Sequence, residues 1–198
     1  MRSFGNDLTP VDPRPDRLRA ALLAPDEAQP VAVRGSVDAA VLAPLFGLSG
    51  RAGLVFTERR EDLRRHAGEI SFPGGRPEPG EDLLAAALRE AEEEIGLEAG
   101  DVEVLGALPP VSTVVTGYLI PPFVGLIPTG LAFEPNPDEV AAVLLLHLDE
   151  LEAGFGMRRL VRRGVPIKTP TYVVGEHLVW GATARILQSL FARLEGAS

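Results

Sequence analysis

The chain has 198 residues, 45% of them hydrophobic and 24% charged, which is typical of one soluble globular domain with extensions. It contains no cysteine, which excludes disulfides, cysteine nucleophiles and cysteine-ligated zinc. The net charge of −9 argues against a general nucleic-acid binder, because such a protein needs a basic face to neutralise phosphates.

The N-terminal residues 1–35 are expected to form an arm, because prolines and charges punctuate them. This arm holds a short helix candidate at 17–24, and residues 36–48 are expected to form a second short amphipathic piece. Neither a signal sequence nor an apolar run of membrane-spanning length is found, so a cytoplasmic protein is expected. Residues 36–198 are predicted to be the functional domain.

The remaining elements are strand candidates separated by Pro- and Gly-rich breaks, with two longer helices among them. The strands are expected at 52–59, 69–75, 102–108, 113–120, 122–128, 139–146, 158–163 and 170–175, the last two as a hairpin, and the helices at 81–95 and 178–194. Strands and helices do not alternate strictly. This favours a mixed sheet sandwiched between helices over a doubly wound fold.

The helix predicted at 81–95 carries three glutamates at i, i+3 and i+4. At about 100° per residue, Leu84, Leu88, Ala91 and Ile95 fall within an arc of about 60°, a narrow core-facing stripe. The glutamates share a separate arc of about 100°, centred about 140° away. They are Glu90, Glu93 and Glu94. Such a face is usually only solvated, so these three residues alone do not decide the function.

Seven residues in and around this helix stand at the spacing G-x5-E-x7-R-E-x-x-E-E-x-G. They are Gly75, Glu81, Arg89, Glu90, Glu93, Glu94 and Gly96. A chance match is expected in fewer than roughly one chain in 10⁵. The pattern resembles the Nudix box, with Leu97 as its closing aliphatic residue and Ala91 where the family prefers a larger one. The resemblance implies an α/β (α+β) fold, a Nudix-type α/β/α sandwich with a mixed β-sheet between helices.

The resemblance also implies a metal site. Glu90, Glu93 and Glu94 would bind Mg²⁺ or Mn²⁺, with the backbone carbonyl of Gly75 as a further ligand. Hard oxygen ligands suit these cations, and a cation removes the mutual repulsion of the glutamates. In the family, Arg89 and Glu81 form a pair that orients the ligands; the alternative is that both are simple surface charges.

The segment before the box, VFTERREDLRRHAGEISFPGG at 55–75, resembles the signature of the coenzyme A pyrophosphatase subfamily. The matching positions are Thr57, Arg59, Arg64, Gly68, Phe72, Pro73, Gly74 and Gly75. Phe56 replaces an aliphatic residue, and Arg60 replaces a small Ser or Ala. Arg60 could alter the pocket or add a phosphate contact. Weaker likenesses extend the resemblance over roughly residues 50–190.

Coenzyme A carries a diphosphate and a separate 3′-phosphate, so it needs cationic contacts away from the metal. Guanidinium groups match phosphate geometry. The candidate substrate contacts are Arg59, Arg64, Arg65, His66, Phe72 and Gly74. The alternative for the arginines and His66 is that they only form an exposed basic turn. Phe72 either packs in the core or stacks on adenine.

The implied reaction cleaves the central diphosphate of coenzyme A to 3′,5′-ADP and 4′-phosphopantetheine. A general base must deprotonate the attacking water. Candidates are Glu93 or Glu94, Glu69 and Glu139, and Glu139 is favoured because it lies at a loop–strand junction after the box. Glu93, Glu94, Glu139 and Arg89 are therefore the predicted catalytic residues.

Two rival interpretations remain. One is a Nudix enzyme acting on another nucleoside diphosphate derivative, such as ADP-ribose or NADH, and Arg60 leaves room for it. The other is a non-catalytic Nudix-fold binding module, which the complete set of box glutamates disfavours. The expected partner is a small-molecule substrate, with neither nucleic acid nor membrane, and a homodimer is an open alternative.

Overall fold

The centre of the fold is a mixed sheet. The computed structural model describes residues 15–28, 37–48, 50–60, 62, 68–112, 118–162 and 165–196. The sheet has the order β10 (Val140–His147), β3 (Gly53–Arg59), β2 (Ala40–Phe46), β9 (Pro122–Leu126) and β6 (Glu103–Ala107). β2 runs parallel to β9, whereas the other neighbours are antiparallel. Two short strands add to it, β4 (Ile70–Ser71) on β3 and β5 (Gly74–Gly75) on β2.

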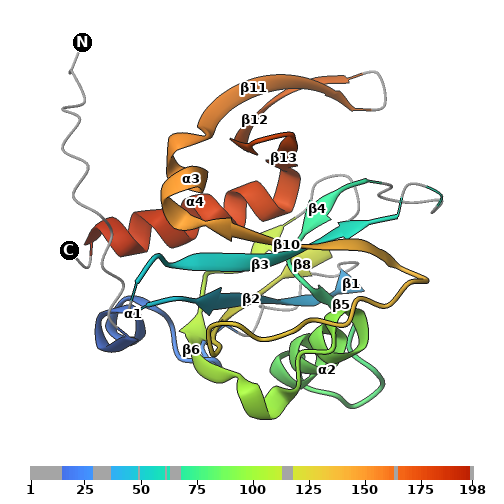
Figure 1. Cartoon of the computed structure of the whole chain (residues 1–198), viewed down its shortest axis with the longest axis vertical. Helices are drawn as coiled ribbons and strands as arrows, with labels where there is room; N and C mark the ends of the chain where they lie inside the picture. The colour runs from blue at the N-terminus through green and yellow to red at the C-terminus, as the bar shows by residue number, and fades with distance from the viewer. Residues whose placement is uncertain are drawn as a thin grey trace.

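Helices cover both faces of this sheet (Figure 1). α2 (Leu83–Ile95) packs on one face, and α1 (Pro15–Ala21) and α4 (Gly181–Gly196) pack on the other. Successive strand residues point to opposite faces, so Leu54 and Phe56 join the cluster under α4 while Val55 joins the cluster under α2. Both faces are therefore buried, and the α/β/α sandwich with a mixed sheet is confirmed.

The box helix begins two residues later than predicted. Asp82 is its N-cap, and its carboxylate accepts the N–H groups of Leu84 and Ala85, both at 2.9 Å. Asp82 and Glu81 thus lie before the first turn, not in it. The helix ends where predicted, because Gly96 adopts a left-handed φ of 68°. A short 3₁₀ turn, η1 (Ala99–Asp101), follows.

The prediction for residues 36–48 was wrong, because they form strands, one of them buried, and not an amphipathic piece; the second long helix is present but begins three residues later than predicted. Residues 36–48 contribute β1 (Val37–Asp38) and the buried central strand β2. The second long helix was expected from residue 178, but β13 (His177–Trp180) precedes it and α4 begins at Gly181. Residues 177–180 form a strand because they pair antiparallel with β12, and the local sequence pattern gives no information about this distant partner.

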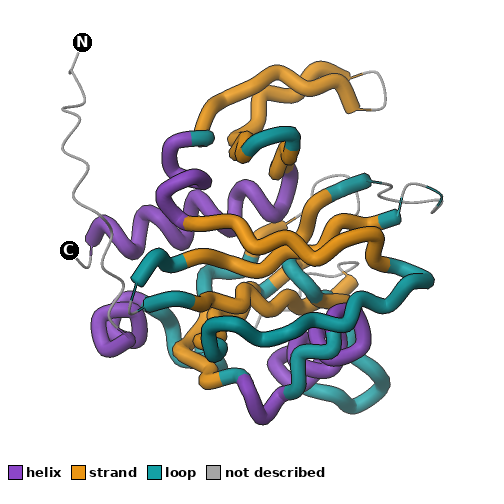
Figure 2. The backbone as a smooth tube through the Cα atoms, viewed as in Figure 1, coloured by secondary structure: helices purple, strands orange, loops and turns teal. Residues whose placement is uncertain are grey.

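The predicted hairpin is present and longer than expected. β11 (Phe155–Arg162) and β12 (Val165–Val174) form it, and with β13 they make a separate three-stranded sheet (Figure 2). The helix α3 (Leu148–Ala153) joins β10 to this sheet. A third small sheet pairs β1 with β8 (Tyr118–Ile120) and β8 with β7 (Val111–Ser112).

The described part of the predicted N-terminal arm packs on the domain. Leu18 of α1 is 1% exposed and belongs to the cluster under α4. Leu23 and Ala107 exchange two backbone hydrogen bonds of 2.9 Å, which attach the arm to β6. The boundary at residue 36 stays a prediction. In the part of the chain that is described, no helix is long and apolar enough to span a membrane.

Phe72 is part of the core. Its side chain is 2% exposed, and its ring stacks on Phe56 with the centroids 4.6 Å apart. We expect Phe72→Ala to lower the free energy of unfolding by about 3–5 kcal/mol, through lost apolar contacts and a residual cavity. Urea unfolding followed by circular dichroism measures this loss. Leu145→Ala, at a half-exposed position on β10, serves as the control and should change stability by less than about 1 kcal/mol. Equal effects of the two substitutions would contradict the core placement.

Candidate active site

The turn at Gly74-Gly75 brings backbone against the glutamate face of α2. β5 pairs with β2, with Gly75 opposite Ala40 and Gly74 opposite Val41. A Cβ atom on Gly75 would lie 2.3 Å from Cδ of Glu90, and one on Gly74 would lie 2.3 Å from the carbonyl oxygen of Ala40. Both approaches are closer than real Cβ atoms tolerate. Glycine is therefore required at position 74, where a Cβ would meet backbone, whereas a side chain at position 75 would displace the Glu90 carboxylate.

Glu94 is the most deeply buried acidic residue among those described, at 6% exposure. Its Oε2 accepts the backbone N–H of Gly74 at 3.2 Å, and its Oε1 lies 3.8 Å from Nη1 of Arg59. Burial raises the pKa of the Glu94 carboxyl to about 7, and the Gly74 N–H and the Arg59 charge only partly oppose this. This carboxylate is thus short of positive charge.

Arg89 organises the other two glutamates of the box. Its Nε and Nη2 donate to the two carboxylate oxygens of Glu81 at 3.0 and 3.1 Å. The same guanidinium reaches Glu90 at 3.2 Å and Glu93 at 3.0 Å. It also donates to the carbonyl of Arg76 at 3.1 Å, which attaches the loop after β5 to the helix. The pairing of Arg89 with Glu81 that the sequence resemblance implied is therefore present in the structure.

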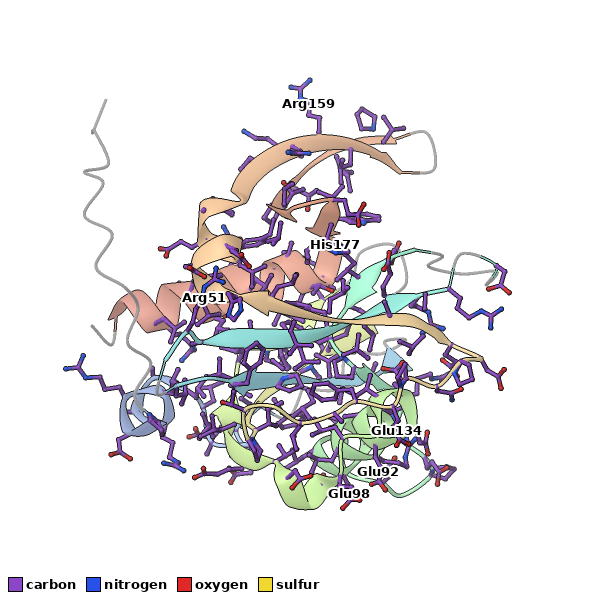
Figure 3. The ribbon with its side chains drawn as sticks, in the orientation of Figure 1. Arg51, Glu92, Glu98, Glu134, Arg159 and His177 are labelled. Atoms are coloured by element: carbon purple, nitrogen blue, oxygen red, sulfur yellow. The ribbon has the colours of Figure 1, made fainter. Side chains whose placement is uncertain are left out.

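The three box glutamates differ in exposure. Glu94 is buried, Glu90 is half-buried against Gly75, and Glu93 is exposed. Burial also raises the pKa of Glu90 above its ordinary value, partly offset by the charge of Arg89. The neighbouring Glu92 projects from the outer side of α2, away from the sheet (Figure 3).

Glu139 joins the candidate site through Arg59. It ends the loop before β10, and its Oε2 lies 3.4 Å from Nη2 of Arg59, the last residue of β3. Arg59 therefore stands between Glu139 and Glu94, and the negative charge of Glu139 raises the pKa values of both Glu90 and Glu94. Residues from three separate elements converge here: α2, the end of β3 and the loop before β10.

The sequence interpretation missed how that loop is attached. The sequence placed Glu139 at a loop–strand junction but gave no contacts for the loop before it. In the structure, the backbone N–H of Asn136 donates to the carbonyl of Glu94 at 2.9 Å, and that of Glu134 donates to Ile95 at 3.0 Å. The Asn136 side chain also accepts the N–H of Asp138 at 3.0 Å. An Asn-Pro-Asp turn beside the end of α2 was the available signal.

Not all predicted substrate contacts reach the site. Arg59 reaches it and contacts Glu94, and the backbone N–H of Gly74 donates to Glu94 instead of remaining available to a substrate. Phe72 lies in the core instead of presenting its ring for stacking. The three remaining predicted contacts, Arg64, Arg65 and His66, lie outside the described residues.

The carboxylates fit a hard divalent cation by their donor chemistry, since Glu94 and Glu90 are partly desolvated and gathered near one another. Within the described ranges, no three acidic or histidine side chains already surround a common point. Arg89 holds Glu93, and Arg59 holds Glu139. The arrangement can thus supply oxygen ligands to a cation, and it can supply one loosely held arginine, Arg59, to a phosphorylated substrate.

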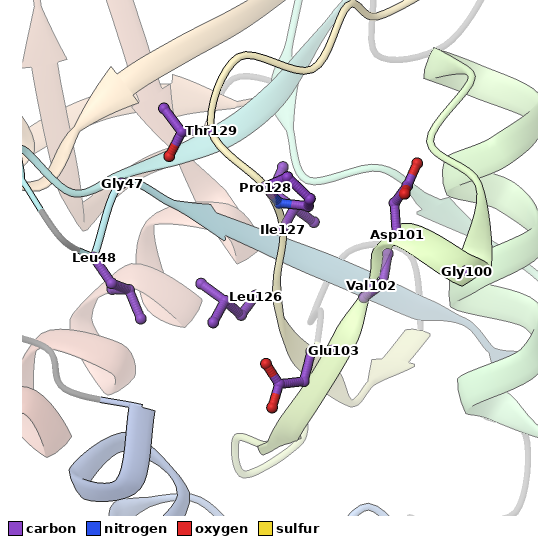
Figure 4. Close-up of a pocket in the computed structure, with 10 residues that line it drawn as sticks. All are labelled: Gly47, Leu48, Gly100, Asp101, Val102, Glu103, Leu126, Ile127, Pro128 and Thr129. Atoms are coloured by element: carbon purple, nitrogen blue, oxygen red, sulfur yellow. The ribbon is translucent and has the colours of Figure 1, made fainter.

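A hollow of about 680 Å³ lies elsewhere on the molecule (Figure 4). Its lining comes from the ends of β2 and β9, from η1 and from the start of β6, and contains none of the predicted site residues. Asp101 and Glu103 line it, and their negative charge disfavours an anionic ligand. The carboxylates of α2 therefore remain the candidate active site.

A family model described as "NUDIX domain" matches residues 37–164. The chain belongs to the Nudix family. A protein of Photorhabdus laumondii named "Uncharacterized Nudix hydrolase NudL" is 39% identical to it over 160 residues, which cover 79% of this chain and 84% of that protein. A protein of the same name from Citrobacter koseri is 42% identical over 155 residues, covering 77% and 80%.

Solved Nudix structures share the fold. A MutT/nudix family protein from Enterococcus faecalis matches with a TM-score of 0.57 at 15% identity, over 86% of this chain and 66% of that one. RenU, a Nudix hydrolase from M. smegmatis, matches with a TM-score of 0.50 at 21% identity, over 59% and 74%. At these identities the likeness establishes the Nudix fold.

Charging Glu94 costs folding free energy in the metal-free Nudix domain. Burial raises the pKa of its carboxyl from 4.5 to about 7, so stability is lost as the pH rises across that interval. Glu94→Gln removes this titration. At pH 8 in EDTA, the variant should exceed wild type in free energy of unfolding by up to about 3 kcal/mol, and near pH 4 the two should be alike. Urea unfolding at both pH values measures the difference.

The matched control is Glu92→Gln on the same helix, where the side chain is exposed. It should leave the pH dependence of wild type unchanged. Equal stabilities of wild type and Glu94→Gln at pH 8 would contradict a desolvated Glu94 carboxylate.

Proposed function

We propose that this Nudix protein is a divalent-metal-dependent hydrolase that cleaves the diphosphate of coenzyme A or its derivatives. The products would be 3′,5′-ADP and 4′-phosphopantetheine. The observation that carries the hydrolase assignment is the convergence of Glu94 and Glu139 on Arg59, with Glu90 near enough to both carboxylates to interact with them electrostatically. The complete box and the family of its relatives support the same class of reaction.

Glu90, Glu93 and Glu94, with the carbonyl of Gly75, would hold Mg²⁺ or Mn²⁺. When bound, the cation polarises the diphosphate and makes water more acidic. Glu94 needs positive charge because it is buried with one N–H donor and an arginine 3.8 Å away. Arg89 fixes the positions of Glu90 and Glu93, since a single guanidinium contacts both.

Glu139 is the proposed general base. Its side chain is half exposed, so water can reach it, and it lies across Arg59 from the box glutamates. It would accept the proton of the attacking water, while Arg59 moves from carboxylates to phosphate oxygens and stabilises the charge that develops there. Glu93 is bound by Arg89 and Glu94 by Gly74, which leaves them less suited to this role.

The choice of coenzyme A rests on the signature at residues 55–75. Arg59 lies at the carboxylates, as a phosphate contact should. Arg64, Arg65 and His66 are proposed to contact the remaining phosphates, and they continue the same segment beyond β3. Another nucleoside diphosphate derivative, such as ADP-ribose or NADH, is the alternative substrate.

A substrate panel tests the proposal. The purified protein with Mg²⁺ or Mn²⁺ is incubated with coenzyme A, its disulfide, an acyl ester, ADP-ribose and NADH, and the products are identified by mass. We expect the highest kcat/KM for a form of coenzyme A, with no turnover in EDTA. Far faster turnover of ADP-ribose or NADH would contradict the coenzyme A assignment. Equal activity of wild type and Glu94→Gln, or none in either, would contradict catalysis by the box.

A methyl group at Gly75 should weaken metal binding. Gly75→Ala would place Cβ 2.3 Å from Cδ of Glu90 and displace that carboxylate. We expect the Mg²⁺ concentration for half-maximal activity to rise by about 10-fold or more, as for other changes around metal ligands. Gly100→Ala is the control, because open space surrounds that position. An unchanged metal requirement in Gly75→Ala would argue that Glu90 does not hold the cation.

A further inference from the structure

Arg60 is the residue at which this chain departs most from its subfamily signature, and the structure gives it a defined set of contacts. It directly follows β3. Its Nε donates to Oδ1 of Asp62 at 2.9 Å, and its Nη2 donates to Oδ2 at 2.6 Å. Its Nη1 donates to the backbone carbonyl of Pro137. All three guanidinium nitrogens are therefore engaged within the protein.

The carbonyl of Pro137 belongs to the loop that ends at Glu139. We call residues 134–139 the Glu139 loop. On one side, two backbone hydrogen bonds of 2.9 and 3.0 Å attach this loop to the last residues of α2. On the other side, the backbone N–H of Arg60 donates to the carbonyl of Glu139 at 3.1 Å, and the guanidinium adds the bond to Pro137. The loop thus spans from the end of α2 to the end of β3.

Regular strand pairing ends close to this point. The β3–β10 ladder begins at Arg59 and Val140 and shifts register between Val140 and Ala142. Beyond the ladder, the contacts of Arg60 continue the attachment of β3 to the segment that carries Glu139. A small residue in place of Arg60 would retain the backbone bond but lose the side-chain bond to Pro137 and the pairing with Asp62.

We propose that Arg60 is a positioning residue, which holds the Glu139 loop against the end of β3 and so places Glu139 for proton transfer. This inference rests on the proposed role of Glu139. It explains the departure from the signature without a phosphate contact, because a phosphate would have to compete with both oxygens of Asp62 and with a backbone carbonyl. A forked guanidinium on Asp62 fixes the direction of the third donor, which a flexible lysine would not do.

The far end of the same strand pair offers a matched control. Arg51 precedes β3, and its Nε lies 3.2 and 3.0 Å from the two carboxylate oxygens of Asp149, which follows β10 (Figure 3). Arg51 is paired with carboxylates near the surface, as Arg60 is, and its Nη2 also lies 3.0 Å from Glu150; it lies at the end of the ladder opposite Glu139. Arg51→Ser removes a similar surface pair while leaving the Glu139 loop intact.

The first experiment measures the loop itself and needs no substrate. In hydrogen–deuterium exchange of the full chain, Arg60→Ser should increase exchange in peptides covering residues 134–141, and Arg51→Ser should not. Unchanged exchange of these peptides in Arg60→Ser would overturn the proposal. Because this measurement is independent of turnover, it separates failure of the loop attachment from failure of the proposed reaction.

The second experiment is a double-mutant cycle with Glu139→Gln, using whichever compound of the panel is hydrolysed. Arg60→Ser should lower kcat by about 10-fold with little change in KM, within the loss of up to about 10²-fold that a misplacement of about 1 Å causes. In the Glu139→Gln background, the same substitution should have no further effect. Arg51→Ser should keep the wild-type kcat.

The cycle also discriminates against the alternatives. A rise in KM that persists in the Glu139→Gln background would indicate direct substrate contact by Arg60. Arg60→Lys retains the charge but not the fork, so it should behave like Arg60→Ser. Wild-type kcat in Arg60→Lys would mean that charge alone matters, and it would overturn the positioning role.

Discussion

The candidate active site is organised around a carboxylate that is almost completely removed from water. Glu94 lies beneath the Gly74-Gly75 turn at 6% exposure, with one backbone N–H and one distant arginine to balance its charge. A desolvated carboxylate strongly favours either protonation or a nearby cation. Three other parts of the candidate site act on this group: Gly74 donates to it, Arg59 lies 3.8 Å from it, and the charge of Glu139 raises its pKa.

Two arginines divide the work of holding the acidic residues. Arg89 contacts residues in and next to α2: it pairs with Glu81, Glu90 and Glu93, and it donates to the loop after β5. Arg59 instead connects two elements, because it lies between α2 and the loop before β10. Of the two, Arg59 is the one proposed to exchange its carboxylate partners for phosphate, because its contacts are long, at 3.4 and 3.8 Å.

The sequence alone determined the box helix, its acidic face and the class of fold. Glutamates at i, i+3 and i+4 must share one helix face, and Gly96 must end the helix, because these relations involve only neighbouring residues. The ion pair between Arg89 and Glu81, which the resemblance implied, is likewise present in the structure. The predicted strand at 52–59 was found as β3 because a run of buried apolar residues is recognisable without knowing its partners.

Only the tertiary structure decided which distant residues meet. Sheet pairing brings the end of β3 beside the start of β10, and so joins Arg59 and Arg60 to the Glu139 loop. Phe72 lies in the core because its ring stacks on Phe56. His177–Trp180 forms a strand because it pairs with β12, and Ala40–Phe46 forms a strand that is buried at the centre of the sheet. Local periodicity carries no record of such contacts, since their free energy comes from partners far away in the chain. The pattern of residues proposed to bind metal could therefore be read from the sequence, whereas the opposing wall of the candidate active site could not.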